Sequence, residues 1–271
     1  MFQRPKLCRG LCWHLHRIWI FVALLAAGPL WAQDPFEIHV YDYETLRPGQ
    51  FTLEQHLNYW AKGSKQADGT VAPTNDQLHM TYELTAGLTS QLSLGFMQLN
   101  AVRPGAGLEY AGWRVLPHWY APEAWHLPVK LGLVTEFSFV RPQYEADSRH
   151  VEIRPIVEFD AGPFDVVVNP VFARALHGPG TREGWQFEPA ARVAWGESAT
   201  RRVVPYLEWY SEMGPVRHFS SASEQVHQAF PGVDWRIMEH LVWSVGVGAG
   251  LTSQEPRLVL KSHLEFEFGR R

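Results

Sequence analysis

Cysteine is almost absent from this sequence, and so are long apolar runs. The two cysteines, Cys8 and Cys12, precede the apolar stretch from Ile18 to Ala27, which is roughly half of the ~20 residues that a membrane-spanning helix needs. A basic region, a short apolar region and a small residue at the cut are typical of a secretory signal, so we predict a signal peptide over residues 1–32. Cleavage after Gly28 is the alternative. The mature chain then has no thiol, which excludes a disulfide framework and a cysteine nucleophile.

Positive charge is also scarce. The predicted signal holds Arg4, Lys6, Arg9 and Arg17 and no acid, so the mature chain carries 20 of the 24 basic residues against 28 acidic ones, a formal charge of −8. An acidic protein repels nucleic acid, and we expect no nucleic-acid partner.

Helical periodicity is missing after the signal, and the pattern everywhere has a period of two. In residues 77–88 the apolar side chains of Leu78, Tyr82 and Leu84 share one face, while His79 and Glu83 lie on the other. Residues 51–61 alternate in the same way. Both segments have the length of a tilted strand that crosses a bilayer, whereas strands of soluble domains average nearer five or six residues.

This pattern predicts an all-β fold, a transmembrane antiparallel up-and-down β-barrel of about 12 strands in residues 33–271. An even number places both termini in the periplasm, and long polar connections alternate with tight ones as extracellular loops and periplasmic turns do. The connection 117–128 is an exception, because it is long and by parity periplasmic. The expected strands are 51–61, 77–88, 92–101, 108–116, 129–140, 150–160, 164–173, 185–195, 203–213, 225–235, 241–251 and 257–268.

Aromatic residues gather near the ends of these strands, as expected at membrane interfaces. The predicted periplasmic group is Trp195, Trp235, Trp243, Phe266 and Phe268, and the opposite group is Tyr59, Phe139, Trp185, Trp209 and Tyr210.

The last strand also resembles the C-terminal strand of bacterial outer-membrane proteins, which often ends in Phe and is read by the barrel-assembly machinery, although Gly269, Arg270 and Arg271 follow the aromatic here. Expected partners are therefore this machinery and outer-membrane lipid.

The faces opposite the apolar rows carry many charged residues, mostly carboxylates. In a soluble sandwich such a face is solvated surface. In a membrane barrel it lines the lumen, because an ion facing lipid costs roughly 2 to 4 kcal/mol at the midplane. We expect Arg154 and Arg192 to pair with neighbouring glutamates. The predicted lumen-lining charged residues are Glu54, Glu83, Glu136, Glu152, Arg154, Glu158, Glu188, Arg192, Glu208, Lys261 and Glu265.

Three histidines, His56, His79 and His263, face the same side from strands that become neighbours when the barrel closes. Together with Glu54 and Glu265 they are candidates for a Zn²⁺ site. Their interpretation as ordinary hydrogen-bonding residues is favoured, and we predict no resident metal and no cofactor.

Prolines interrupt the pattern at Pro155, Pro170, Pro189 and Pro205. Each removes one donor from the hydrogen-bond ladder. Either the strand limits are shifted there, or the wall is locally weakened and provides a lateral opening for apolar solutes.

Four short runs carry a resemblance to known proteins, namely 36–41, 152–156, 169–170 and 187–190. They resemble a group of little-characterised proteobacterial outer-membrane barrels, the outer-membrane proteins of phenol degradation (MetA pathway). The resemblance implies an outer-membrane barrel that passes hydrophobic or aromatic compounds, and it supplies no catalytic or binding residues.

Motifs of hydrolases, phosphate loops and dinucleotide-binding turns are absent, which favours a protein that is not an enzyme. Ser138, Ser211 and Ser244 leave open a hydrolase with a site assembled from distant strands. We predict a passive channel for small solutes in the outer membrane of a Gram-negative bacterium, with an acidic lumen. A membrane-embedded hydrolase and a non-conducting structural or partner-binding barrel are the alternatives.

Overall fold

The computed structural model describes residues 34–196, 201–252 and 258–269, which belong to one compact unit. The predicted signal peptide therefore lies outside the described residues. None of the described helices is long and apolar enough to cross a membrane. The only helical elements described are two 3₁₀ turns, η1 at Glu123–Trp125 and η2 at Pro179–Arg182.

Antiparallel strands make up most of the described chain. Their limits are β1 Gln50–Lys62, β2 Gln77–Gly87, β3 Leu92–Arg103, β4 Gly107–Tyr120, β5 Lys130–Val140, β6 Arg149–Ala161, β7 Phe164–Asn169, β8 Phe172–His177, β9 Trp185–Phe187, β10 Ala190–Trp195, β11 Val203–Glu212, β12 Val226–Met238, β13 Leu241–Gly250 and β14 Leu258–Gly269.

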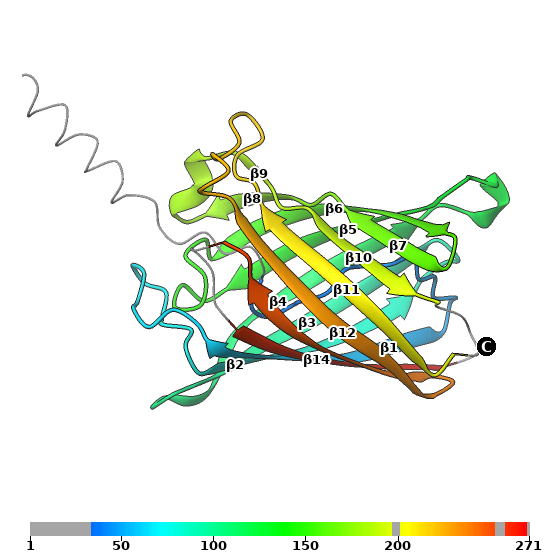
Figure 1. The fold of residues 1–271 in the computed structure, drawn as a ribbon, viewed down its shortest axis with the longest axis horizontal. Helices are drawn as coiled ribbons and strands as arrows, with labels where there is room; N and C mark the ends of the chain where they lie inside the picture. The colour runs from blue at the N-terminus through cyan, green and yellow to red at the C-terminus, as the bar shows by residue number, and fades with distance from the viewer. Residues whose placement is uncertain (1–33, 197–200, 253–257, 270–271) are drawn as a thin grey trace, which may run out of the picture. The chain divides into compact units, whose positions relative to one another are not determined.

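The sheet closes on itself. The first strand pairs with the last, with Gln50 opposite Gly269, and β5 pairs with β6 to complete the ring. Figure 1 shows the strands running obliquely around this wall. Closure gives the strands neighbours on both sides and removes the unpaired edges that an open sheet would have. The short β9 pairs with β8, and its other side is hydrogen-bonded to residues 213–215.

The wall has twelve passes, which confirms the predicted strand number. Two passes are divided at prolines, so that β7 and β8 form one pass and β9 and β10 the next. Pro155 and Pro205 stay in register within β6 and β11.

The division is bridged on both sides. Glu188 N donates to Val171 O at 2.9 Å, and Ser211 N donates to Pro189 O at 3.0 Å. The ladder is thus interrupted only locally, and these contacts do not support the hypothesis of a lateral opening.

Side chains alternate across the wall as the period of two predicts. On β1 and β2, Leu53 and Leu84 are 47% and 46% exposed, whereas Thr52 and Glu83 are each 1% exposed. Because the ring is closed, the buried row is the inner one. The outer row forms the apolar surface expected to face lipid.

The two rims differ in the length of their connections. We call the rim where β1 begins and β14 ends the terminal rim, and the opposite one the loop rim. The terminal rim has short turns at 88–91, 162–163 and 239–240, and the loop rim has long loops at 63–76 and 213–225.

The exceptional connection is shorter than the sequence analysis expected. The strand predicted to end at residue 116 continues to Tyr120, and Pro117 remains in register opposite Leu94 with its side chain on the exposed row. The connection is therefore 121–129.

The aromatic side chains largely follow the prediction. At the terminal rim Trp195, Trp235 and Phe266 are 51%, 48% and 45% exposed on the outer surface. Tyr210, which was assigned to the opposite outer ring, is only 2% exposed and its hydroxyl donates to Glu208 Oε2 at 3.0 Å, so that assignment is wrong.

The outer row provides a test of the lipid-facing surface. We expect Leu84→Arg to destabilise the barrel in lipid vesicles by about 2 to 4 kcal/mol if the side chain lies near the midplane, and by less toward an interface. Urea unfolding followed by tryptophan fluorescence measures this. The control is Leu127→Arg, at an exposed leucine in the connection 121–129, which should change little. Equal losses in the two variants would contradict a lipid-facing row at Leu84.

Candidate functional site: the barrel lumen

Residues 34–49, which we call the lumenal segment, lie inside the barrel. The segment contacts side chains from β1, β2, β4, β6, β7 and β14, which lie along an arc of the ring from β14 through β4 to β7, and only the interior is adjacent to all of them. It runs from the side of Asn58 and Thr81 down to Gln50 at the terminal rim, where β1 begins.

Wall side chains take the place of a neighbouring strand for this segment. Asn169 pairs with both backbone groups of Tyr41, accepting from Tyr41 N at 2.8 Å and donating to Tyr41 O at 2.9 Å. Thr81 Oγ1 donates to Phe36 O at 2.8 Å, and Lys261 Nζ donates to Ile38 O at 3.0 Å. A buried backbone needs such partners, because unpaired amide and carbonyl groups are costly away from water.

One row of the segment is apolar. Phe36, Ile38 and Val40 are each 1% exposed and belong to one core cluster with inward-facing wall residues. The wall members of this cluster include Trp60, Met97, Leu99, Leu116, Ile156 and Phe230. The interior is therefore not uniformly polar, which the sequence analysis did not predict.

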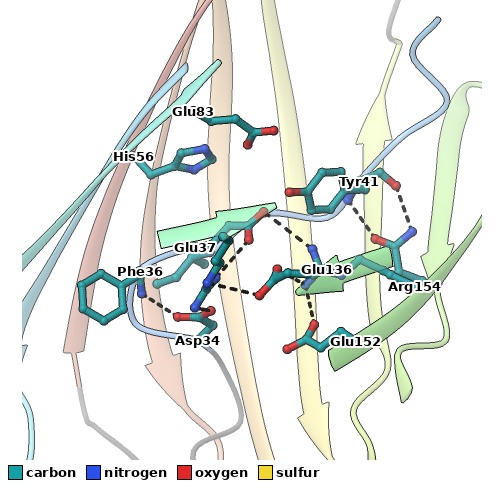
Figure 2. Close-up of polar contacts among 12 residues, drawn as sticks. Asp34, Phe36, Glu37, Tyr41, His56, Glu83, Glu136, Glu152 and Arg154 are labelled. Atoms are coloured by element: carbon teal, nitrogen blue, oxygen red, sulfur yellow. Dashed lines mark hydrogen bonds and ion pairs between the residues drawn. The ribbon is translucent and has the colours of Figure 1, made fainter. Parts of the chain in front are cut away.

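The other row carries charge and meets two buried arginines. Arg114 is fully buried on β4 and pairs with Asp34, with Glu37 at 3.4 Å and with Glu136 at 3.1 Å. Figure 2 shows Arg154 of β6 between Glu152 and Glu37. Its guanidinium lies 2.7 Å from Glu152 and 3.6 Å from Glu37. The same guanidinium stacks over the Tyr41 ring, 4.6 Å from the ring centre.

These pairs lower the cost of holding carboxylates away from water, because each acid faces a fixed cation. They also connect the segment to the wall. The predicted pairing of Arg154 with glutamates agrees with these contacts, and Arg192 pairs with Asp234.

A cavity of about 670 Å³ lies toward the terminal rim, beside residues 39–44 of the lumenal segment. Eight carboxylates and four arginines line it, together with several histidines and tyrosines. The carboxylates are Asp42, Glu44, Glu54, Glu208, Asp234, Glu239, Glu265 and Glu267, and the arginines are Arg192, Arg201, Arg202 and Arg236.

The structure places the eleven predicted lumen-lining residues as follows. Eight are buried, namely Glu83, Glu136, Glu152, Arg154, Glu158, Arg192, Glu208 and Lys261. Glu54 and Glu265 line the large cavity, and Glu188 lines a second one of about 110 Å³ beside His150 and Glu152. Several are paired inside the wall, since Lys261 Nζ lies 2.5 Å from Glu208 Oε2 and Glu158 pairs with Lys130.

Only two of the three candidate histidines come together. His56 and His263 are register partners on β1 and β14, and their rings stack at 4.3 Å. Both lie beside Glu54, and the potential ligand atoms of these three residues are all within 4.8 Å of one another. His79 instead packs edge-on against Phe36 and Trp60.

Sequence reasoning missed Arg114, Asp34, Glu37 and the anchoring role of Asn169. Arg114 alternates with Trp113 and Val115, so the local pattern carried a signal. A β-bulge at Ala111 changes the phase of β4, and this is visible only in the pairing with β3.

No protein-family model and no curated protein matches the sequence. Among solved structures, the COG4313 outer membrane channel from Pseudomonas putida F1 has a TM-score of 0.55 at 12% identity, over 86% of this chain and 100% of that one. The KdgM porin in complex with disordered oligogalacturonate has a TM-score of 0.49 at 7% identity, covering 81% of this chain and 99% of that one.

The similarity to the Pseudomonas putida channel shows the fold, and the chain therefore has the fold of an outer-membrane β-barrel. The specific resemblance to proteins of phenol degradation stays a prediction.

The arginine network provides a test of how the lumen is held together. We expect Arg114→Ala to destabilise the barrel by about 3 to 5 kcal/mol, because it leaves buried carboxylates without their cation. Urea unfolding in vesicles measures the loss. Arg141→Ala is the control, because Arg141 is exposed and its side chain donates to the Tyr110 carbonyl rather than to a buried carboxylate in the contacts described. A loss no larger than that of the control would show that Arg114 is not needed to compensate these acids.

Proposed function

We propose that the protein is a channel in the outer membrane of a Gram-negative bacterium, passing small solutes through a lumen that the lumenal segment narrows. The observation that carries this proposal is the cavity of about 670 Å³ inside a closed barrel, lined by ionisable side chains. A site buried for structural reasons alone would be filled or paired, whereas this one has room for a solute. The Pseudomonas putida protein with the same fold is itself an outer membrane channel.

The cavity favours cations and neutral solutes over anions. Carboxylates outnumber arginines by eight to four along it, and part of the positive charge is consumed where Arg192 pairs with Asp234. Rings of acidic side chains are a common source of cation preference in pores. Tyr41, Tyr43 and Tyr120 also line the cavity, which suits small solutes with an aromatic part.

The first part of the lumenal segment fills the lumen next to this cavity. Phe36, Ile38 and Val40 pack there against wall side chains, so a solute that crosses the barrel must pass beside this segment or displace it. Its polar anchors are the side chains of Asn169, Thr81 and Lys261, which hold backbone groups rather than a strand ladder. The segment is thus the element whose position sets the width of the path.

The orientation proposed has the terminal rim in the periplasm. Short turns lie at this rim and long loops at the other, which is the usual asymmetry of outer-membrane barrels. The cavity then opens from the periplasmic side of the lumen.

The hydrolase alternative finds less support. Ser138, Ser211 and Ser244 lie opposite His150, His227 and His263 in the strand register. The described hydrogen bonds of two of them go elsewhere, since Ser138 accepts from Arg114 Nε at 3.1 Å and Ser244 lies 2.9 Å from the Tyr206 hydroxyl. These partners suit structural roles in the wall.

Loosening the lumenal segment should increase conduction. In planar bilayers we expect Asn169→Ala to raise the mean conductance or the open fraction, because it removes both hydrogen bonds to the Tyr41 backbone. The matched control is Asn100→Ala, at a partly exposed position on β3 outside that contact. Silence of the wild type and of Asn169→Ala under all salt gradients would overturn the channel proposal.

Charge preference gives a second test. A unit charge about 7 Å from an ion in water contributes about 0.6 kcal/mol, or roughly threefold in ion occupancy. We expect Glu265→Gln, in the cavity, to lower the cation-to-anion permeability ratio by up to that factor in a KCl gradient. Glu224→Gln, in the loop 213–225 at the opposite rim, should leave the ratio unchanged. Equal ratios in the wild type and Glu265→Gln would contradict an acidic path at this point.

A further inference from the structure

Three side chains with metal-binding chemistry converge on the inner wall where the barrel closes. Glu54 and His56 are two residues apart on β1 and share the inner face, and His263 lies opposite His56 on β14. Glu54 Oε2 is 2.8 Å from His263 Nε2 and 3.4 Å from His56 Nε2. The ladder thus holds two imidazoles and one carboxylate around a single point.

His56 is a second and independent indication. The residue is 1% exposed, its Nδ1 has no hydrogen-bond partner in the part of the chain that the structure describes, and its Nε2 has the 3.4 Å contact with Glu54. A buried polar atom without a partner is costly, and this one belongs to a ring that lies beside a carboxylate and a second imidazole. Its Nε2 atom faces Glu54 Oε2, the same oxygen that His263 Nε2 contacts.

We propose that Glu54, His56 and His263 form a binding site for a divalent transition-metal ion, with Zn²⁺ as the best-fitting case. Two histidines and a carboxylate are a common zinc donor set, and imidazole ligands select such ions over Mg²⁺ and Ca²⁺. Two ligand atoms on one Zn²⁺ are at most about 4.2 Å apart, so small side-chain rotations bring together a set whose ligand atoms lie within 4.8 Å of one another.

Binding replaces a proton. In the metal-free site the contact between His263 and Glu54 needs a proton between nitrogen and oxygen, whereas a metal ion takes the lone pairs of neutral imidazole nitrogens and of the carboxylate. The ion therefore occupies the position of that proton. In a neutral His263 the proton moves from Nε2 to Nδ1, and in a ring protonated at both nitrogens the Nε2 proton is released to solvent. Bonds from the ion to the two imidazole nitrogens and to the carboxylate oxygen replace the N–H···O contact.

His39 is placed to complete the coordination from the lumenal segment. Its ring lies 5.0 Å from that of His263 and 6.0 Å from that of His56, and it lines the same cavity as Glu54 and His263. An ion held by the wall with an open position toward the cavity would thus face a third histidine as its fourth ligand, and it would link the segment to the closing seam of the barrel.

A second cluster, Glu136, His150 and Glu152, has similar spacing but different surroundings. Its carboxylates already face guanidinium groups, with Arg114 3.1 Å from Glu136 and Arg154 2.7 Å from Glu152. Around Glu54 the ion-pair partners described are histidines, and Lys261 is held by Glu208 and the Ile38 carbonyl. The competing positive charge is thus absent from the described contacts of Glu54.

The test uses the tag-free, folded full chain in detergent, with ZnCl₂, CoCl₂ and MgCl₂ as separate probes. We expect one Zn²⁺ per chain by calorimetry, a visible absorption band of four-coordinate Co²⁺ that Zn²⁺ abolishes, and no comparable binding of Mg²⁺. His56→Gln and His263→Gln should weaken Zn²⁺ binding by at least about tenfold, which is the lower end of the loss caused by removing even an outer-shell partner.

The matched control is His79→Gln, which changes a buried lumenal histidine on the neighbouring strand that also has an unpartnered ring nitrogen, and it should keep the affinity. Heat-modifiable migration in gels establishes folding of each variant, and the near-isosteric Glu54→Gln replaces any histidine variant that does not fold. Absence of one-to-one binding in the wild type, or an equal loss in His79→Gln, would overturn the site. This result is independent of conduction, because binding is measured without solute flow.

Discussion

The closed hydrogen-bond ladder is the constraint on which the rest of this structure depends. Pairing of β1 with β14, and of β5 with β6, leaves no open edge, so successive side chains must alternate between the outside and the inside. The apolar row takes the outside. The other row, with its glutamates, arginines and histidines, is carried into a confined interior whether or not that interior suits charge.

The interior resolves this conflict with its own chain. A ring of twelve passes is wider than one filled by its wall side chains alone, and the lumenal segment occupies part of the difference. Its apolar row packs against Met97 and Leu99, and its acids face Arg114 and Arg154. Segment and wall are complementary in shape and in charge, and each would leave unpaired buried groups without the other.

The fold was predictable because alternation is local. In residues 51–61 and 77–88 the alternation within a single strand is enough to assign the inner and outer faces. The structure has the same faces in β1 and β2. What failed depends on partners distant in the sequence. The bulge at Ala111 shifts the phase of β4 relative to β3, and Pro117 stays within β4, in register with Leu94 on β3. The run 36–41 alternates like any strand, and no local signal tells that its partners are the side chains of Asn169, Thr81 and Lys261 rather than another backbone.

This difference in partners has a mechanical meaning. A strand in the wall is held by a continuous ladder on both sides, and it cannot leave without opening the barrel. The lumenal segment is held by separate hydrogen bonds, each contributing about 0.5 to 1.5 kcal/mol when neutral and more when charged, and by contacts of one apolar row. These contacts can break in sequence, because none of them is part of the ring. Any change in the width of the lumen that leaves the barrel intact must therefore involve this segment, which the wall holds through side chains of β1, β2, β4, β6, β7 and β14.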